Sequence, residues 1–455
     1  MVLKRVIIAG AGSGVGKTTI ATGIMALLSK KYKVQGFKVG PDYIDPSFHS
    51  VATGRPSRNL DSFLLDRKTI LNVFGWTMRD ADIAVIEGVR GLYDGLTSTG
   101  DTGSTAEIAK ILGAPVILVV NARSLAKSAA AHVLGFKMLD QSIRIEGVIL
   151  NQVSGERHRK KAIEAVEKLT HTPVIGAIER KKEQLPERHL GLVTMHEKED
   201  PMKTIRFIAE MASEIDLDGL LEISEKAEPF EFPANCPFPT KEEKGVKIAV
   251  PFDRAFSFYY PENIESIEAA GGKVIKFKPA EGDAFPEADG YYIGGGYPEI
   301  YAEALSSNKD FMEGLRSAAE EGKLIYGECG GLITLCESIT FGGKKWKMAG
   351  IFKCDSIVSL DRQGLAYVEA VGTRDNFMFP AKRVRGHEFH YSRISPIPTG
   401  PFAYSIERGV GIDGKNDGLI RQRVIGAYLH QHALSNKDWG LRFVEEAYAS
   451  SRSMH

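Results

Sequence analysis

The chain is poor in cysteine, carries no excess charge of either sign and has no long apolar run. Its 455 residues include four scattered cysteines, and no two of them form a C-x-x-C pair. This pattern excludes a disulfide framework and gives no zinc motif, so we expect reduced thiols. Lys and Arg together number 58, as do Asp and Glu. This balance disfavours nucleic acid and anionic membranes as partners.

The absence of a long apolar run also bears on location. No segment approaches the about 20 apolar residues that cross a bilayer. Residues 1–10 lead directly into a glycine-rich loop rather than to a signal-peptide cleavage site. We therefore expect a cytoplasmic protein, and a chain of this length is typical of two or three domains.

Short β-branched runs alternate with helical stretches in both halves of the chain. Continuous apolar strands separated by helices are typical of a parallel sheet covered on both faces. A polar segment with four prolines, residues 223–244, interrupts the alternation and is predicted to be a linker. The sequence therefore predicts an α/β protein with two doubly wound domains, residues 1–222 and 245–455. Strands are expected near residues 5–9, 83–86, 115–120, 147–150, 173–176, 246–250, 273–277, 290–293 and 323–326.

Residues 10–19, Gly-Ala-Gly-Ser-Gly-Val-Gly-Lys-Thr-Thr, have the composition of a loop that holds the phosphates of a nucleotide. A buried strand precedes the loop, and the helix that follows would turn its first amides toward the phosphates. Lys17 would bridge the terminal phosphates, and the Thr18 hydroxyl would bind Mg²⁺. The residues predicted to contact ATP in this loop are Gly12, Ser13, Gly14, Gly16, Lys17, Thr18 and Thr19.

Two positions set this loop apart from related ones. Ala11 stands where the usual G-x-x-x-x-G-K-T pattern has its first glycine, and Gly10 supplies a glycine one residue earlier. Gly12 stands where switch ATPases that position proteins or plasmids have a second lysine. The loop therefore favours a synthetase over a switch ATPase.

Four acidic residues follow predicted strands in the first half, where open α/β sheets bind ligands. Any one of these acidic residues could equally well be a solvated loop residue. Four acidic residues beside a phosphate loop, however, indicate a site that phosphorylates a substrate carboxylate. Mg²⁺, Lys17 or Lys38 must neutralise them, because unpaired carboxylates cannot share a dry site while ionised. The four acids are Asp42, Asp45, Glu87 and Asp94; the predicted Mg²⁺ ligands are Thr18, Asp45 and Glu87.

Two further residues are predicted to contact the nucleotide. Lys38 ends a strand just before the first two acids, and Asn151 ends the strand at 147–150. Asn151 occupies the place that often contacts adenine in nucleotide-binding domains, and a loop cap is an equally good interpretation of this residue.

A strained cysteine turn is predicted at Gly-Glu-Cys-Gly-Gly, residues 327–331. The glycines relieve the crowding of a sharp strand-to-helix turn that presents Cys329 at its apex. We expect the helix N-terminus behind the sulfur to lower the thiol pKa and favour the nucleophilic thiolate. The amides near Gly330 and the turn at residues 294–296 would form an oxyanion hole. Cys336 lies on the apolar face of the next helix and is predicted to be core.

The thiolate needs a base, and His430 follows an apolar strand-like run. Triad-type glutamine amidotransferases usually end in His-Pro-Glu, whose glutamate orients the histidine. Here the residue two after His430 is His432, which leaves either a Cys-His dyad or an orienting group that the sequence does not reveal. His387 and His390 are expected on a polar strand near this site rather than in a metal site. His49 has no partner that the sequence indicates.

Taken together, these residues resemble the cobyrinate a,c-diamide synthase family, and the resemblance runs nearly end to end. In that family the N-terminal P-loop NTPase domain is similar to dethiobiotin synthetase, and the C-terminal domain is a triad-type (class I) glutamine amidotransferase. The segment at 38–46 is highly specific, whereas the phosphate loop alone would not be. The resembling segments are 13–19, 37–46, 59–61, 87–88, 147–151, 253–256, 258–260, 294–299, 328–331 and 385–391.

The resemblance implies an ATP-dependent ligase that amidates the a and c acetate side chains of a corrin-type tetrapyrrole, with L-glutamine as the nitrogen donor. Cys329 would release ammonia from glutamine. The acids named above would bind Mg²⁺ and orient the substrate carboxylate. A second branch of the family acts on nickel-sirohydrochlorin in coenzyme F430 synthesis, and the sequence does not separate the two. A homodimer is compatible with the sequence.

Three other functions are less well supported. The segment at 38–46 weighs against cobyric acid synthase, which amidates other side chains. A CTP-synthase-like amidotransferase would keep His-Pro-Glu. A regulatory ATPase with an inactive glutaminase-like module would be favoured by loss of the nucleophile, and Cys329 is present.

Overall fold

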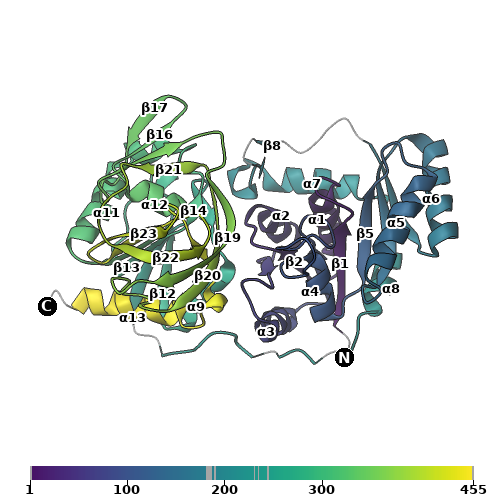
Figure 1. The fold of residues 1–455 in the computed structure, drawn as a ribbon, viewed down its shortest axis with the longest axis horizontal. Helices are drawn as coiled ribbons and strands as arrows, with labels where there is room; N and C mark the ends of the chain where they lie inside the picture. The colour runs from purple at the N-terminus through teal and green to yellow at the C-terminus, as the bar shows by residue number, and fades with distance from the viewer. Residues whose placement is uncertain are drawn as a thin grey trace. The chain divides into compact units, whose positions relative to one another are not determined.

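The computed structural model describes residues 3–180, 187–188, 191–229, 231–233, 235–242 and 245–452. The chain divides into two compact units, residues 1–237 and 238–455 (Figure 1). The division falls inside the segment predicted to be a linker. Within the described residues, no helix is long and apolar enough to cross a membrane.

The first unit is built on a seven-stranded sheet in the order β3-β2-β4-β1-β5-β6-β7, and every pairing in it is parallel. Its strands are nearly continuously buried, as expected when helices cover both faces. A small hairpin, β8 and β9, lies outside this sheet. The strands are β1 (Lys4–Gly10), β2 (Val34–Val39), β3 (Arg58–Leu60), β4 (Ile83–Glu87), β5 (Val116–Asn121), β6 (Ile145–Val153), β7 (Val174–Glu179), β8 (Glu187–Arg188) and β9 (Gly191–Leu192).

Helices of the first unit pack on both faces of this sheet. Ile24 of α1 and Ile223 of α8 share one apolar cluster with Val6 and Ile8 of β1. On the other face, the ring of Phe74 in α3 stacks on Phe37 of β2 at 5.1 Å. The helices are α1 (Lys17–Leu28), α2 (Ile44–Thr53), α3 (Arg67–Met78), α4 (Thr105–Leu112), α5 (Lys127–Leu139), α6 (Gly155–Thr170), α7 (Pro201–Met211), α8 (Leu217–Glu225) and the 3₁₀ turn η1 (Met195–Glu197).

The first part of the predicted linker packs on the first unit. Helix α8 continues to Glu225, and the buried Arg5 guanidinium donates to the carbonyl of Glu228 at 2.6 Å. The Phe232 ring lies 4.8 Å from that of Phe74. Residues 223–229 and Phe232 therefore belong to the first unit, and the polar composition of the segment did not indicate this packing.

The second unit is built on a ten-stranded sheet in the order β12-β10-β13-β15-β24-β23-β22-β19-β20-β25. The pairings from β12 to β24 are parallel and the remaining ones are antiparallel. The strands of the parallel part before β24 were predicted. In the antiparallel part, the strand that carries His387 and His390 was predicted and is β20, and the other strands were not. The sheet strands are β10 (Val246–Pro251), β12 (Gly272–Phe277), β13 (Gly290–Ile293), β15 (Leu324–Glu328), β19 (Gly364–Gly372), β20 (Arg383–His390), β22 (Phe402–Arg408), β23 (Asn416–Arg421), β24 (Val424–Ala427) and β25 (His430–Gln431).

Two smaller sheets and the helices complete the second unit. The order of the four-stranded sheet is β17-β16-β18-β21, and β11 pairs with β14. These strands are β11 (Phe256–Phe258), β14 (Gly295–Gly296), β16 (Ser338–Phe341), β17 (Lys344–Lys347), β18 (Asp355–Val358) and β21 (Ser392–Ser395). The helices are α9 (Pro261–Ala269), α10 (Ala302–Ser307), α11 (Lys309–Glu320), α12 (Gly330–Leu335), α13 (Trp439–Arg452) and the 3₁₀ turns η2 (Pro279–Glu281) and η3 (Ala433–Ser435).

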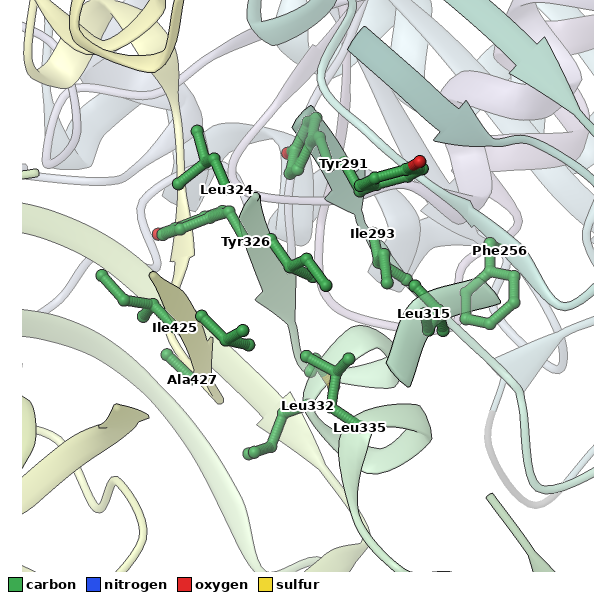
Figure 2. Packing of buried hydrophobic residues seen from close by; sticks show 14 of the residues in the cluster. Phe256, Tyr291, Ile293, Leu315, Leu324, Tyr326, Leu332, Leu335, Ile425 and Ala427 are labelled. Carbon is green, nitrogen blue, oxygen red and sulfur yellow. The ribbon is translucent and has the colours of Figure 1, made fainter. Parts of the chain in front are cut away.

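The core of the second unit lies around its parallel strands. Figure 2 shows Tyr326 of β15 between Tyr291 of β13 and Ile425 of β24, with Leu332 of α12 packed below them. Leu332 and Leu335 are fully buried. This packing anchors the short helix that follows Cys329, and so it holds the cysteine turn against the carboxyl ends of β13, β15 and β24.

Candidate functional site

The phosphate loop joins β1 to α1, as the sequence predicted. Gly16 has a φ of 91°, and a Cβ there would lie 2.4 Å from the side-chain nitrogen of Asn151. Only glycine fits this position. Asn151 Nδ2 donates to the carbonyl of Val15 at 2.8 Å, so this side chain supports the loop from β6. A contact between Asn151 and adenine stays a prediction.

Lys17 lies at the first position of α1, with its ammonium inside the loop. Its Nζ donates to the carbonyl oxygens of Arg90 at 2.6 Å and Gly12 at 3.2 Å. Burial, together with the nearby Lys38, lowers the pKa of Lys17. A buried ammonium that donates to backbone carbonyl oxygens is well suited to exchange them for phosphate oxygens, because these carry full charge.

Lys38 and Glu87 lie side by side at the carboxyl ends of β2 and β4, where they are partners in the parallel register. Lys38 Nζ is 2.6 Å from Asp45 Oδ2 and 2.9 Å from Glu87 Oε1. Glu87 Oε1 also accepts from the Thr18 hydroxyl at 2.7 Å. Thr18, Lys38, Asp45 and Glu87 thus form one cluster, in which Lys38 and Glu87 are buried and Thr18 and Asp45 are partly buried.

Charge neutralisation in this cluster is uneven. Burial alone would lower the pKa of Lys38, but Asp45 and Glu87 raise it, so the ammonium stays charged. Burial alone would raise the pKa of Glu87, but Lys38 and His49 hold it below its ordinary value. One ammonium does not neutralise two carboxylates: burial, Asp42 and Glu87 raise the pKa of Asp45. The expected neutralising role of Lys38 agrees with this geometry.

Asp42 and Asp94 lie at the same end of the sheet and hold loops. Asp42 Oδ1 accepts from the backbone amides of Ile44 at 2.8 Å and Asp45 at 3.2 Å. Asp94 Oδ2 accepts from the amide of Gly91 at 2.9 Å. Their catalytic roles stay predictions, since these contacts are those of turn caps.

The residues predicted to hold Mg²⁺ offer the hydroxyl and carboxylate oxygens that this ion prefers. Thr18 and Glu87 place two such oxygens 2.7 Å apart, whereas Asp45 is bound to Lys38. The described part of the chain has no cluster of three His, Cys, Asp or Glu side chains suited to a metal. The donors therefore fit an ion held by Thr18 and Glu87 whose shell is completed by water and phosphate oxygens.

The cysteine turn of the second unit has the predicted strand-to-helix geometry. Cys329 follows β15, precedes α12 and has φ 49° and ψ −92°. Its amide donates to the carbonyl of Ala427 at 2.7 Å. A Cβ at Gly331 would lie 2.2 Å from the carbonyl oxygen of Ile293, so the turn requires glycine there. Strain of this kind is typical of a nucleophile elbow.

The prediction that the thiol pKa of Cys329 is lowered is wrong. Cys329 is buried, and burial, together with the carboxyl groups of Glu299 and Glu328, raises the pKa of its thiol. Cys329 therefore rests as a thiol, and as a nucleophile it would depend on a base for activation. All four cysteines are free, as expected, and Cys336 is fully buried in the core, as predicted.

Backbone amides lie where an oxyanion hole is predicted. A Cβ at Gly330 would lie 3.2 Å from the amide nitrogen of Gly296, so the two glycines are in close contact. The amide of Gly294 donates to the Tyr259 hydroxyl at 2.8 Å. Of the turn at residues 294–296, Gly296 is therefore the better candidate donor, together with Gly330.

His430 opens β25 and is a register partner of His387 on β20. The two imidazole rings stack with centroids 4.9 Å apart. Burial lowers the pKa of His430, and the neighbouring His387 and His390 lower it further. A neutral imidazole is the form that accepts a proton, so His430 is suited to act as a general base.

Comparisons with known proteins identify the family. Residues 6–193 match the CobQ/CobB/MinD/ParA nucleotide binding domain, and residues 247–438 match the CobB/CobQ-like glutamine amidotransferase domain. The cobyrinate a,c-diamide synthase of Methanosphaera stadtmanae is 47% identical over 98% of this chain and 99% of its own length. This chain belongs to the cobyrinate a,c-diamide synthase family. The synthases of Methanothermobacter thermautotrophicus and Archaeoglobus fulgidus are 45% and 43% identical, each over 98% of this chain and over 99% and 98% of their own lengths.

Membership of the cobyrinate a,c-diamide synthase family confirms the resemblance inferred from the motifs. The chain is a glutamine-hydrolysing ligase that forms amide bonds, with a nucleotide-binding domain followed by a glutamine amidotransferase domain.

His49 also contacts the cluster beside the phosphate loop, and the sequence did not indicate this residue. Its Nε2 lies 2.7 Å from Glu87 Oε2, and both side chains are fully buried. His49 lies in the middle of α2 with no motif around it, so only the packing of α2 against β2 and β4 reveals the contact. We infer that it orients the Glu87 carboxylate.

Replacement of His49 tests this role. We expect His49→Gln to lower kcat of ammonia-dependent amidation by about 10-fold, a loss typical of a residue that orients a ligand side chain. His132→Gln, at an exposed position of α5, is the matched control and should leave the rate unchanged. Equal rates for His49→Gln and the native chain would contradict the role.

Proposed function

We propose that this enzyme uses ATP to amidate the a and c acetate carboxylates of cobyrinate, with glutamine as the nitrogen donor. The observation that carries the proposal is the cluster of Thr18, Lys38, Asp45 and Glu87 beside the phosphate loop, in a chain that also has a cysteine elbow. The named activity of relatives that match nearly end to end supports the choice of substrate.

Glutamine hydrolysis would take place at the elbow. His430 removes the proton of the Cys329 thiol as sulfur attacks the glutamine amide carbon. The amides of Gly330 and Gly296 stabilise the negative oxygen of the tetrahedral intermediate. The proton passes to the leaving nitrogen, ammonia departs, and water hydrolyses the thioester to glutamate.

Carboxylate activation would take place at the phosphate loop. The substrate carboxylate attacks the terminal phosphorus of ATP, which gives an acyl phosphate and ADP. Ammonia then displaces phosphate to form the amide. Lys17 stabilises the transferred phosphoryl group, and Lys38 holds Glu87 ionised. Mg²⁺ bound through Thr18 and Glu87 would supply positive charge to the phosphates.

A second candidate is a,c-diamidation of nickel-sirohydrochlorin. It draws support from the sources of the relatives, several of which are methanogens. The chemistry at both sites would be the same, and only the macrocycle would differ.

Mass spectrometry after incubation with ATP, Mg²⁺, glutamine and each macrocycle separates the candidates. We expect cobyrinate to gain two amide groups, with two ATP consumed per molecule. Each conversion of –COOH to –CONH₂ lowers the mass by the same small step, so the two amidations can be counted. Amidation of nickel-sirohydrochlorin alone would favour the second candidate, and amidation of neither would contradict both.

A further inference from the structure

The buried carboxyl group of Glu328 lies directly before the nucleophile and next to its base. Glu328 ends β15, and its side chain is fully buried. Its Oε2 is 3.9 Å from His430 Nδ1. Oε2 also accepts from the Tyr292 hydroxyl at 2.9 Å, and Oε1 accepts from the Gln431 amide at 3.1 Å. Both oxygens are thus held in place by donors.

The Cε1–Nε2 edge of the His430 ring faces Gly295 of β14. A Cβ at Gly295 would lie 2.5 Å from Cε1 and 3.4 Å from Nε2 of His430. Gly295 belongs to the strand that contacts Gly330, the residue after Cys329. The ring therefore has Nδ1 toward a carboxyl group and its Nε2 edge toward the elbow. In a catalytic triad the histidine has this same orientation: Nδ1 faces the carboxylate and Nε2 faces the nucleophile.

A hydrogen-bonded network holds the segment that carries His430. Asn263 Nδ2 donates to the Gln431 carbonyl at 2.8 Å, and its Oδ1 accepts from the Ala433 amide at 2.7 Å. The same Nδ2 is 2.9 Å from the Tyr292 hydroxyl that bonds Glu328. The Gln431 side chain donates to Tyr326 and Tyr404, each at 2.8 Å. Glu328 and His430 are therefore parts of one rigid, buried arrangement.

We propose that Glu328 is the positioning residue for His430. It takes the place of the glutamate of the usual His-Pro-Glu motif, whose position two residues after His430 is occupied here by His432. The proposal rests on the roles given above to Cys329 and His430. When sulfur bonds to the amide carbon, the thiol proton moves to His430 Nε2. The Glu328 carboxylate then faces the Nδ1–H of the imidazolium and stabilises its charge. The Nε2 proton leaves with ammonia, and Glu328 is chemically unchanged.

The other buried carboxyl group near this segment is tied to a different histidine. Glu262 Oε2 is 3.6 Å from His432 Nε2. The Tyr260 ring lies 4.6 Å from the His432 ring, and its hydroxyl is 3.2 Å from His387 Nδ1. Glu262 therefore makes a matched comparison, because it is an equally buried glutamate paired with a histidine of the same segment.

The titration of Glu328 offers a second readout. Burial raises its pKa to about 8, against the opposing effect of the Gln431 amide and the Tyr292 hydroxyl. Burial raises the pKa of the Cys329 thiol and lowers that of His430, so neither should titrate near pH 8. The titratable groups that face Glu328 are Cys329, His430, Tyr259, Tyr292 and Tyr326.

The test compares Glu328→Gln, Glu262→Gln and Cys329→Ala by glutamine hydrolysis and by ammonia-dependent amidation. We expect Glu328→Gln to lower kcat of hydrolysis by about 100-fold with unchanged KM, since it removes the charge that stabilises the imidazolium. Ammonia-dependent amidation and the melting temperature should be retained. The native rate should rise with pH around 8 as Glu328 ionises, and the variant should lose this rise. Glu262→Gln should keep both the rate and the pH profile.

The outcomes separate this inference from the proposed function. A native hydrolysis rate in Glu328→Gln, or a loss confined to Glu262→Gln, would overturn the role of Glu328 alone. Glutamine hydrolysis that persists in Cys329→Ala would overturn the proposed nucleophile as well. A Glu328→Gln variant with raised KM, lowered melting temperature and an unchanged pH profile would show a structural role and would also overturn the inference.

Discussion

Cys329→Ala is expected to abolish glutamine-dependent amidation, with a fall in kcat of at least about 10⁴-fold, as for the loss of other catalytic nucleophiles. Without the sulfur no thioester forms, and no ammonia is released from glutamine. Added ammonium salts should restore amidation, because the phosphate loop and the Lys38 cluster belong to the other unit. The assay measures amide product with glutamine or with ammonium as the nitrogen source.

The matched control is Cys236→Ala. Cys236 is partly exposed, and the structure gives it no part in either site. This variant should amidate with glutamine at the native rate. If ammonium fails to rescue Cys329→Ala while the chain remains folded, the proposed division of work between the two units is wrong.

The parallel parts of both units could be predicted because their strands are continuously apolar. The runs around residues 83–86 and 147–150 lie within β4 and β6, with boundaries that differ by a few residues. The antiparallel strands β19, β20, β22 and β23 are different, because they mix polar and apolar residues instead of forming continuous apolar runs. Glu369 and Arg385, for example, pair across β19 and β20, which no local pattern indicates.

The first site could be predicted in part for the same reason. Lys38 and Glu87 follow apolar runs, and parallel strands bring their carboxyl ends together, so their contact follows from the fold class. His49 lies within a helix, where its role depends on which strand ends the helix covers. The low exposure of Cys329 also escaped prediction: a glycine-rich turn indicates an elbow, but not the burial that raises the thiol pKa.

Lys38→Met is expected to abolish amidation with both nitrogen sources and to lower the free energy of unfolding by about 3–5 kcal/mol. The lysine side chain is buried, and its ammonium contacts Asp45 and Glu87. Methionine fills a similar volume but removes the charge that keeps Glu87 ionised, so two carboxyl groups would face each other without their cation. Urea denaturation measures the stability, and amide formation from ammonium measures the activity.

The double variant Lys38→Met/Glu87→Gln separates charge from packing. It removes one of the two unmatched carboxyl groups, so it should be more stable than Lys38→Met alone. It should remain inactive, because Thr18 then lacks its carboxylate partner. His49 can still bond the glutamine amide, which preserves the local geometry. Equal stability of the two variants would mean that the lysine acts mainly through the packing of its aliphatic chain, and that the acids are neutralised without it.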